Sequence, residues 1–132
     1  MTRIQLIRKL NKQARVVRSY QRTYEKCRES GDTNKERLLN KADDLLDALR
    51  AFGVLMKKFA SSLENKGEFL RLCCEWDALE ALAYQYDDDK RQRYTPPVQY
   101  FCSTAEELIT RFSELTVEMV NEFEKCIEGG AE

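Results

Sequence analysis

The sequence contains no histidine, and it has few residues that interrupt helices, with two prolines and five glycines in 132 residues. Histidine is the commonest general base and metal ligand, so its absence excludes Ser-His-Asp and Cys-His nucleophile systems. It also excludes the Glu-x-x-His di-iron sites of ferritin-like bundles. Neither a P-loop nor a G-x-G-x-x-G motif occurs, so no phosphate-binding loop is predicted. We therefore expect a protein that is not an enzyme.

Long apolar runs and a regular cysteine framework are also missing. The longest apolar stretch lies near residues 51–56, far short of the roughly 20 residues that span a bilayer. The N-terminal segment lacks the continuous apolar region of a signal peptide. The cysteines are odd in number and form no C-x-x-C pair, which favours reduced, buried thiols over disulfides or a zinc site. They are Cys27, Cys73, Cys74, Cys102 and Cys126. We expect a cytoplasmic protein that binds no cofactor, metal or membrane.

The composition, with 42% apolar and 34% charged residues, is typical of a globular helical protein. No linker or repeat divides the chain, so we predict a single helical-bundle domain over residues 1–132. The net charge of −1 hides an asymmetry. Residues 1–30 contain nine basic and two acidic side chains, a local charge of +7, so the remainder carries −8. Charge separated in this way can steer a partner or pair one helix with another.

Capping residues and apolar spacing predict four long helices. The first covers residues 3–30 and the second residues 34–64. The third follows the break at 65–67 and fades in the charged stretch at 87–93. The fourth lies near the C-terminus. Thr2 with Gln5 forms a capping box for the first helix, and Thr33 with Glu36 forms one for the second. The fourth helix starts with Thr95 as N-cap and a proline in its first turn.

Each predicted helix carries an apolar stripe in which large residues recur every three or four positions. The most regular stripe belongs to the second helix and consists of Leu38, Ala42, Leu45, Leu49, Phe52, Met56, Phe59 and Leu63. The first two connections are only about three or four residues long, which favours antiparallel neighbours. The sequence therefore predicts an all-α, antiparallel up-down-up-down four-helix bundle with long helices.

One arrangement of acidic residues resembles a catalytic site. Some all-α nucleotide pyrophosphohydrolases hold magnesium with acidic clusters on two neighbouring helices. The carboxylates that resemble this pattern are Asp43, Asp44, Asp47, Asp77 and Glu80. The register predicts that most of them face solvent, so a solvated helix face is the favoured interpretation and metal-dependent hydrolysis is the weaker alternative.

The strongest feature outside the predicted core is a row of cations on the outer face of the first helix. It consists of Arg8, Lys12, Arg15, Arg18, Arg22 and Lys26, and their spacing places them opposite the apolar stripe. We call these six residues the basic ridge. Three interpretations compete: a solvated surface partly paired with acidic helices, a contact for an acidic protein partner, and a contact for a nucleic-acid backbone. Acidic residues that could pair with the ridge are Glu107, Glu114, Glu118 and Glu122.

The second feature is the aromatic and basic segment from Tyr84 to Phe101. Its candidate contact residues are Lys90, Arg91, Arg93 and Tyr94. Aromatic and arginine side chains can anchor an interface or stack on bases. The alternative is that the aromatic residues close one end of the bundle.

These observations favour a non-enzymatic interaction protein that docks on a larger protein or ribonucleoprotein through the basic ridge and the aromatic segment. In size and helicity alone, the chain resembles the small subunits of CRISPR effectors and phage-encoded inhibitors of bacterial defence. The first resemblance implies the alternative function of a nucleic-acid-binding subunit. Val117, Val120 and Ile127 lie outside the main stripe of the fourth helix, so the sequence allows either a monomer or a homodimer.

Overall fold

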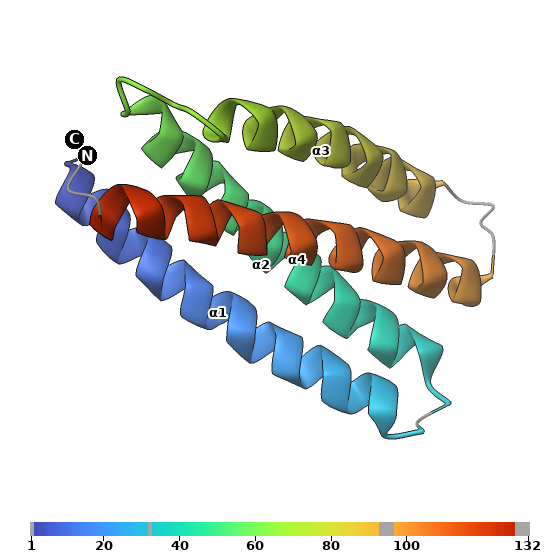
Figure 1. The fold of residues 1–132 in the computed structure, drawn as a ribbon. Coiled ribbons are helices and arrows are strands. Elements are labelled where there is room, and N and C mark those ends of the chain that lie inside the picture. The colour runs from blue at the N-terminus through green and yellow to red at the C-terminus, as the bar shows by residue number, and fades with distance from the viewer. Residues whose placement is uncertain (1, 32, 93–96, 129–132) are drawn as a thin grey trace.

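The computed structural model describes residues 2–31, 33–92 and 97–128, and these residues form four helices and no strand (Figure 1). The helices are α1 (Arg3–Glu29), α2 (Lys35–Ser61), α3 (Phe69–Arg91) and α4 (Val98–Glu128). The predicted all-α class with four long helices is confirmed. No described helix has an apolar stretch long enough to cross a membrane.

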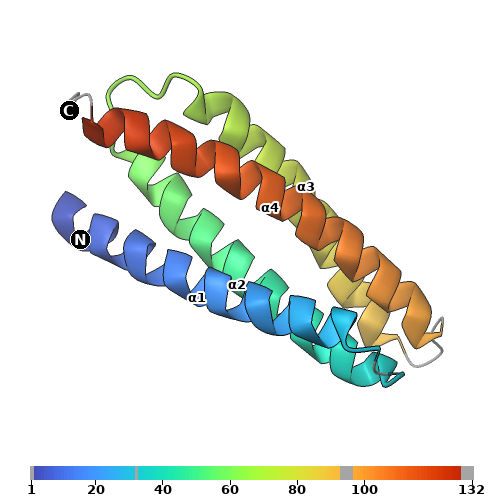
Figure 2. The ribbon, with the colours of Figure 1, turned by 60° about the horizontal axis from the view of Figure 1, so that its bottom comes forward.

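The helices are arranged around α2, which packs against each of the other three. α4 also packs against α3. The backbone of α1 comes close to α2 alone, since no Cα atom of α1 lies within 8 Å of a Cα atom of α3 or α4. Figures 1 and 2 show α1 and α3 on opposite flanks, with the start of α1 and the end of α4 at the same end of the molecule as the connection between α2 and α3. The ring of four helices is therefore open between α1 and α4.

Local capping explains where the first two helices begin. The Thr2 side chain accepts a hydrogen bond from the Gln5 amide, and the Gln5 side chain accepts one from Thr2, as the predicted capping box requires. The second prediction was wrong by one residue, because Asn34 and not Thr33 caps α2, by accepting a hydrogen bond from the Arg37 amide. Asparagine is as good an N-cap as any residue, so the nearer one is used.

The third helix ends within the charged stretch at 87–93, as predicted, after continuing through its three aspartates to Arg91. Lys90 and Arg91 offset the partial negative charge of its C-terminus, and Arg91 pairs with Asp88 one turn earlier. The proposed cap Thr95 lies outside the described residues, and the helical part of α4 that is described begins at Val98.

The apolar stripes form one cluster of buried residues drawn from all four helices. Every member of the α2 stripe is buried except Leu38, which is partly buried. The buried residues of α4 are Phe101, Cys102, Ala105, Leu108, Ile109, Phe112, Leu115, Met119 and Phe123. The predicted register of the large apolar side chains is thus confirmed, and α1 contributes fewest to the core because its backbone comes close to that of α2 alone.

A tryptophan from α3 sets the closest approach inside this core. Trp76 is fully buried, and its ring packs edge-on against Phe112 with centroids 4.9 Å apart. Its other side lies against Gly53 of α2, where an added Cβ would be 1.9 Å from Trp76 Cζ2. Glycine is required at position 53 because any side chain would overlap the indole.

Candidate docking surface

The basic ridge lies where the sequence predicted it, on the side of α1 that faces away from α2. All six of its residues are exposed. Arg8 and Lys26 are separated by 18 positions, or about 27 Å at the helical rise of 1.5 Å per residue. Within the described chain, none of the six side chains takes part in an ion pair or hydrogen bond with another residue. Their charge is therefore available to a partner.

The α4 glutamates that could have paired with the ridge do not do so: Glu107, Glu114 and Glu118 lie on the α3 side of that helix, and Glu122 pairs with Lys125. Glu118 pairs with Arg71 of α3. Glu107 and Glu114 line surface hollows between α4 and α3. The one described ion pair between α1 and α4 joins Arg28 to Glu106 at 3.0 Å, and Arg28 is not a ridge residue. The pairing that we considered as an alternative to partner binding is thus not observed among the described residues.

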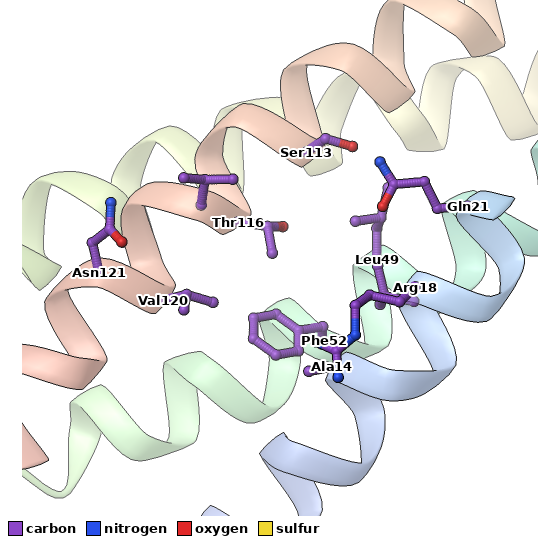
Figure 3. Close-up of a pocket in the computed structure, with 11 residues that line it drawn as sticks. Ala14, Arg18, Gln21, Leu49, Phe52, Ser113, Thr116, Val120 and Asn121 are labelled. Atoms are coloured by element: carbon purple, nitrogen blue, oxygen red, sulfur yellow. The ribbon is translucent and has the colours of Figure 1, made fainter. Parts of the chain in front are cut away.

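A groove lies beside the ridge, in the open seam between α1 and α4. It has a volume of about 240 Å³, and its floor is formed by Leu49 and Phe52 of α2. Its walls are Ala14, Val17, Arg18 and Gln21 of α1, and Ser113, Thr116, Val117, Val120 and Asn121 of α4. Figure 3 shows side chains from the three helices converging on this space, with Phe52 and Val120 pointing into it. The lining is predominantly apolar.

One polar side chain of the groove is already engaged within the protein, and another belongs to the ridge. The Thr116 hydroxyl already donates to the Phe112 carbonyl at 2.7 Å. Arg18 belongs to both the ridge and the groove wall, so it joins the two features into one surface. We call the ridge together with this groove the α1–α4 surface.

Apolar side chains continue the α1–α4 surface toward the chain ends. Val117 is 59% exposed and Ile127 is 45% exposed, whereas Val120 is partly buried. Ile127 lies two helical turns beyond Val120, so it projects from the same side of α4. The sequence indicated that these three residues leave the main stripe. It did not show the groove, because the groove exists only where α1 fails to meet α4.

The aromatic segment is placed only in part. Arg93 and Tyr94 lie outside the described residues. Lys90 is engaged within the protein, since its ammonium group pairs with Asp43 at 2.6 Å and lies over the Tyr86 ring. Arg91 is exposed and pairs with Asp88. Because α1 and α3 do not contact each other, Lys90 and Arg91 are not continuous with the basic ridge.

Three of the acidic residues that resembled a magnesium site, Asp43, Asp77 and Glu80, serve instead as ion-pair partners between α2 and α3, whereas Asp44 and Asp47 are exposed. Asp43 accepts from both Lys90 and the Tyr86 hydroxyl, and Lys57 pairs with Asp77 at 2.5 Å and approaches Glu80 at 3.9 Å. Such pairs link two helices whose backbones approach each other at few points. Among the described residues, no group of three or more potential ligands is placed to hold a metal ion.

The same linkage perturbs the titration of its members. Burial, and secondarily the hydrogen bond to Asp43, raises the pKa of the Tyr86 phenol well above its usual value. The hydrogen bond to Asp77 raises the pKa of the Lys57 ammonium group. Both shifts favour the protonated form, in which Tyr86 and Lys57 donate to carboxylates. These groups are therefore better suited to holding α2 and α3 together than to proton transfer at neutral pH.

Comparisons with protein-family models, curated proteins and solved structures give no significant match to this chain.

Proposed function

We propose that the protein is a non-enzymatic interaction protein that docks on a larger protein or ribonucleoprotein through the α1–α4 surface. The observation that carries this proposal is the basic ridge: six exposed cations along one helix, none of them paired within the described chain. Unpaired charges can steer an oppositely charged partner toward the protein, and an apolar groove can bury part of that partner away from water. Specific interfaces combine these two features.

The proposal includes the arrangement of the helices. It takes the chain to be one domain with an antiparallel, up-down-up-down course, in which α1 is held by α2 and leaves its cationic side and its α4 side accessible. The four observed helices and the packing of α2 against α1, α3 and α4 support this arrangement. Distances between spin labels at exposed positions near the ends of each helix would test it. In antiparallel neighbours the end of one helix lies close to the start of the next, whereas in parallel neighbours these two positions would lie far apart.

Charge reversal on the ridge tests the proposed function. The tagged protein should retain a specific partner from a lysate of the source cells, and a triple variant should lose it. The variant carries Arg8→Glu, Arg15→Glu and Arg22→Glu. Because none of these residues has an ion pair to lose, we expect the melting temperature to change by only a few degrees.

A matched control reverses three exposed cations elsewhere, with the same change in net charge. It carries Lys35→Glu, Lys58→Glu and Arg111→Glu, none of which lies on α1 or lines the groove. The control should keep the partner. Loss of the partner in both variants would show a non-specific charge effect, and retention in the ridge variant would show that α1 is not the contact.

The same ridge supports a second candidate function, the binding of a nucleic-acid backbone. A straight row of unpaired arginines and lysines can neutralise successive phosphates, and the affinity would then fall steeply with salt, with a log–log slope of about −0.9 per phosphate contact on duplex DNA. Titration of single- and double-stranded RNA and DNA at low salt tests this function. Absence of binding at low salt eliminates it, and salt-sensitive binding that the ridge variant loses would favour it over a protein partner.

A further inference from the structure

We infer that the groove between α1 and α4 receives an amphipathic helix of the partner that carries acidic residues beside its apolar stripe. This inference rests on the proposed function and specifies the chemistry of the partner at the same surface. It combines three observations: the open seam between two helices, the apolar lining of the groove, and the different charge of its two walls.

The size and lining of the groove fit apolar anchor side chains. Cavities of about 150 Å³ lined by aliphatic and aromatic residues hold a benzene ring, and this groove has about 240 Å³. Its floor is formed by Leu49 and Phe52, so an inserted leucine or phenylalanine would contact apolar atoms on three sides. The walls belong to two roughly side-by-side helices, which is the geometry that helix-in-groove recognition uses.

The charges around the groove select an acidic helix. On the α1 side, Arg18 lines the groove and the rest of the ridge extends beyond it. On the α4 side, the groove-lining residues from Ser113 to Asn121 are all uncharged, because the carboxylates of this part of α4 face α3. Between Ser113 and Asn121 a partner helix would therefore meet cations on one side and neutral residues on the other. Glu124, one turn beyond Val120, is the next carboxylate on this side of α4. Carboxylates along the edge of that helix next to α1 would pair with the ridge.

The groove is bridged at one end and continues at the other. The Arg28–Glu106 ion pair joins α1 to α4 near the C-terminal end of α1, so the seam is bridged there. Toward the other end, Ile7 and Ile127 lie two helical turns from Ala14 and Val120 and continue the apolar surface. A helix of about four turns would cover the stretch from this bridge toward the chain ends.

Defined peptides test the inference. The probe is a fluorescent 18-residue helical peptide with leucines spaced along one face and glutamates beside them. Its twin replaces every glutamate with lysine. We expect the acidic peptide to bind at least about tenfold more tightly than the basic twin at low salt, with the difference shrinking as salt rises. Failure of the acidic peptide to bind, or equal binding of both twins, would overturn the inference.

Two matched variants locate the binding. Val117→Glu places a charge at the groove, and Leu70→Glu places one on α3 at a residue of similar exposure, 59% and 62% respectively. Val117→Glu should weaken the acidic peptide about tenfold or more, whereas Leu70→Glu should leave its affinity within about twofold. Equal effects of the two substitutions would show that the peptide does not occupy the groove.

The failure of this inference is distinguishable from failure of the proposed function. If Val117→Glu retains the captured partner while the ridge variant loses it, the ridge docks a partner and the groove does not receive its helix. If sedimentation shows a dimer that Val117→Glu dissolves and that the acidic peptide competes with, a second copy of the chain occupies the groove, and the acidic partner helix is the wrong occupant.

Discussion

Replacing Gly53 with alanine should destabilise the protein, although the same change usually stabilises a helix. Alanine is favoured over glycine in a helix interior by about 1 kcal/mol. At position 53, however, the new Cβ would lie 1.9 Å from Cζ2 and 2.0 Å from Cε2 of Trp76. The indole cannot retreat freely, because it is fully buried and packs against Phe112, which is also fully buried.

The expected magnitude follows from the two opposing effects. Overpacking a filled core costs about 1–3 kcal/mol and occasionally more, and an overlap of this depth between rigid groups belongs at the upper end. After the gain in helix propensity, the free energy of unfolding should fall by about 2 kcal/mol, which corresponds to a decrease in melting temperature of about 5–10 °C for a domain of this size.

Urea unfolding measures this effect, followed by circular dichroism and by the fluorescence of the single tryptophan. Ala51→Gly is the control, because residue 51 is exposed on the same helix. This variant should lose only about 1 kcal/mol of the free energy of unfolding, through its lower helix propensity. The double variant Gly53→Ala with Trp76→Phe should lose less free energy of unfolding than the sum of the losses in the two single variants. An increase in stability on Gly53→Ala would refute the close packing of α3 against α2.

Three further predictions concern the linkage between α2 and α3 and the thiols. The raised pKa of Tyr86 keeps its phenol protonated in the folded state, so near pH 10.0 this side chain loses its proton only when the chain unfolds. The free energy of unfolding should therefore fall as pH rises through about 10. Urea titrations at alkaline pH should show a smaller decline for Tyr86→Phe. Asp43→Ala removes the acceptor of two hydrogen bonds and should lower the free energy of unfolding by about 1–3 kcal/mol; a change near zero would show that the linkage does not hold the helices. A thiol reagent at pH 8 should modify exposed Cys74 first and buried Cys102 last, because burial shields Cys102 and raises its pKa; peptide mapping that finds equal rates would contradict the packing of α4.

The sequence was sufficient to predict the features that depend on local periodicity. The stripe from Ala42 to Leu63 is buried as expected, and the Thr2–Gln5 capping box forms. The exposure of the basic ridge follows from the same register, since its residues lie opposite the stripe of α1. These predictions needed only the helical repeat and the side-chain chemistry of the first turn.

Features that depend on how helices meet were not predictable. The spacing of Ala14, Thr116 and Val120 does not reveal that α1 and α4 stay apart, so the groove between them was missed. Likewise, Asp43 was assigned to solvent because its partners, Tyr86 and Lys90, lie on another helix. Long polar side chains can bridge two helices, and the residue pattern of one helix does not show which residues of the other helix they reach.

Photocrosslinking within the captured complex is the most direct test of the central claim that the α1–α4 surface contacts the partner. A photoreactive side chain would be placed at exposed positions 15 and 117 on this surface, and at exposed control positions 58 and 70 away from it. We predict adducts from positions 15 and 117 to a helical, acidic segment of one partner protein, with none from the controls. Adducts from 58 and 70 alone would contradict the account, because the partner would then bind another face of the protein.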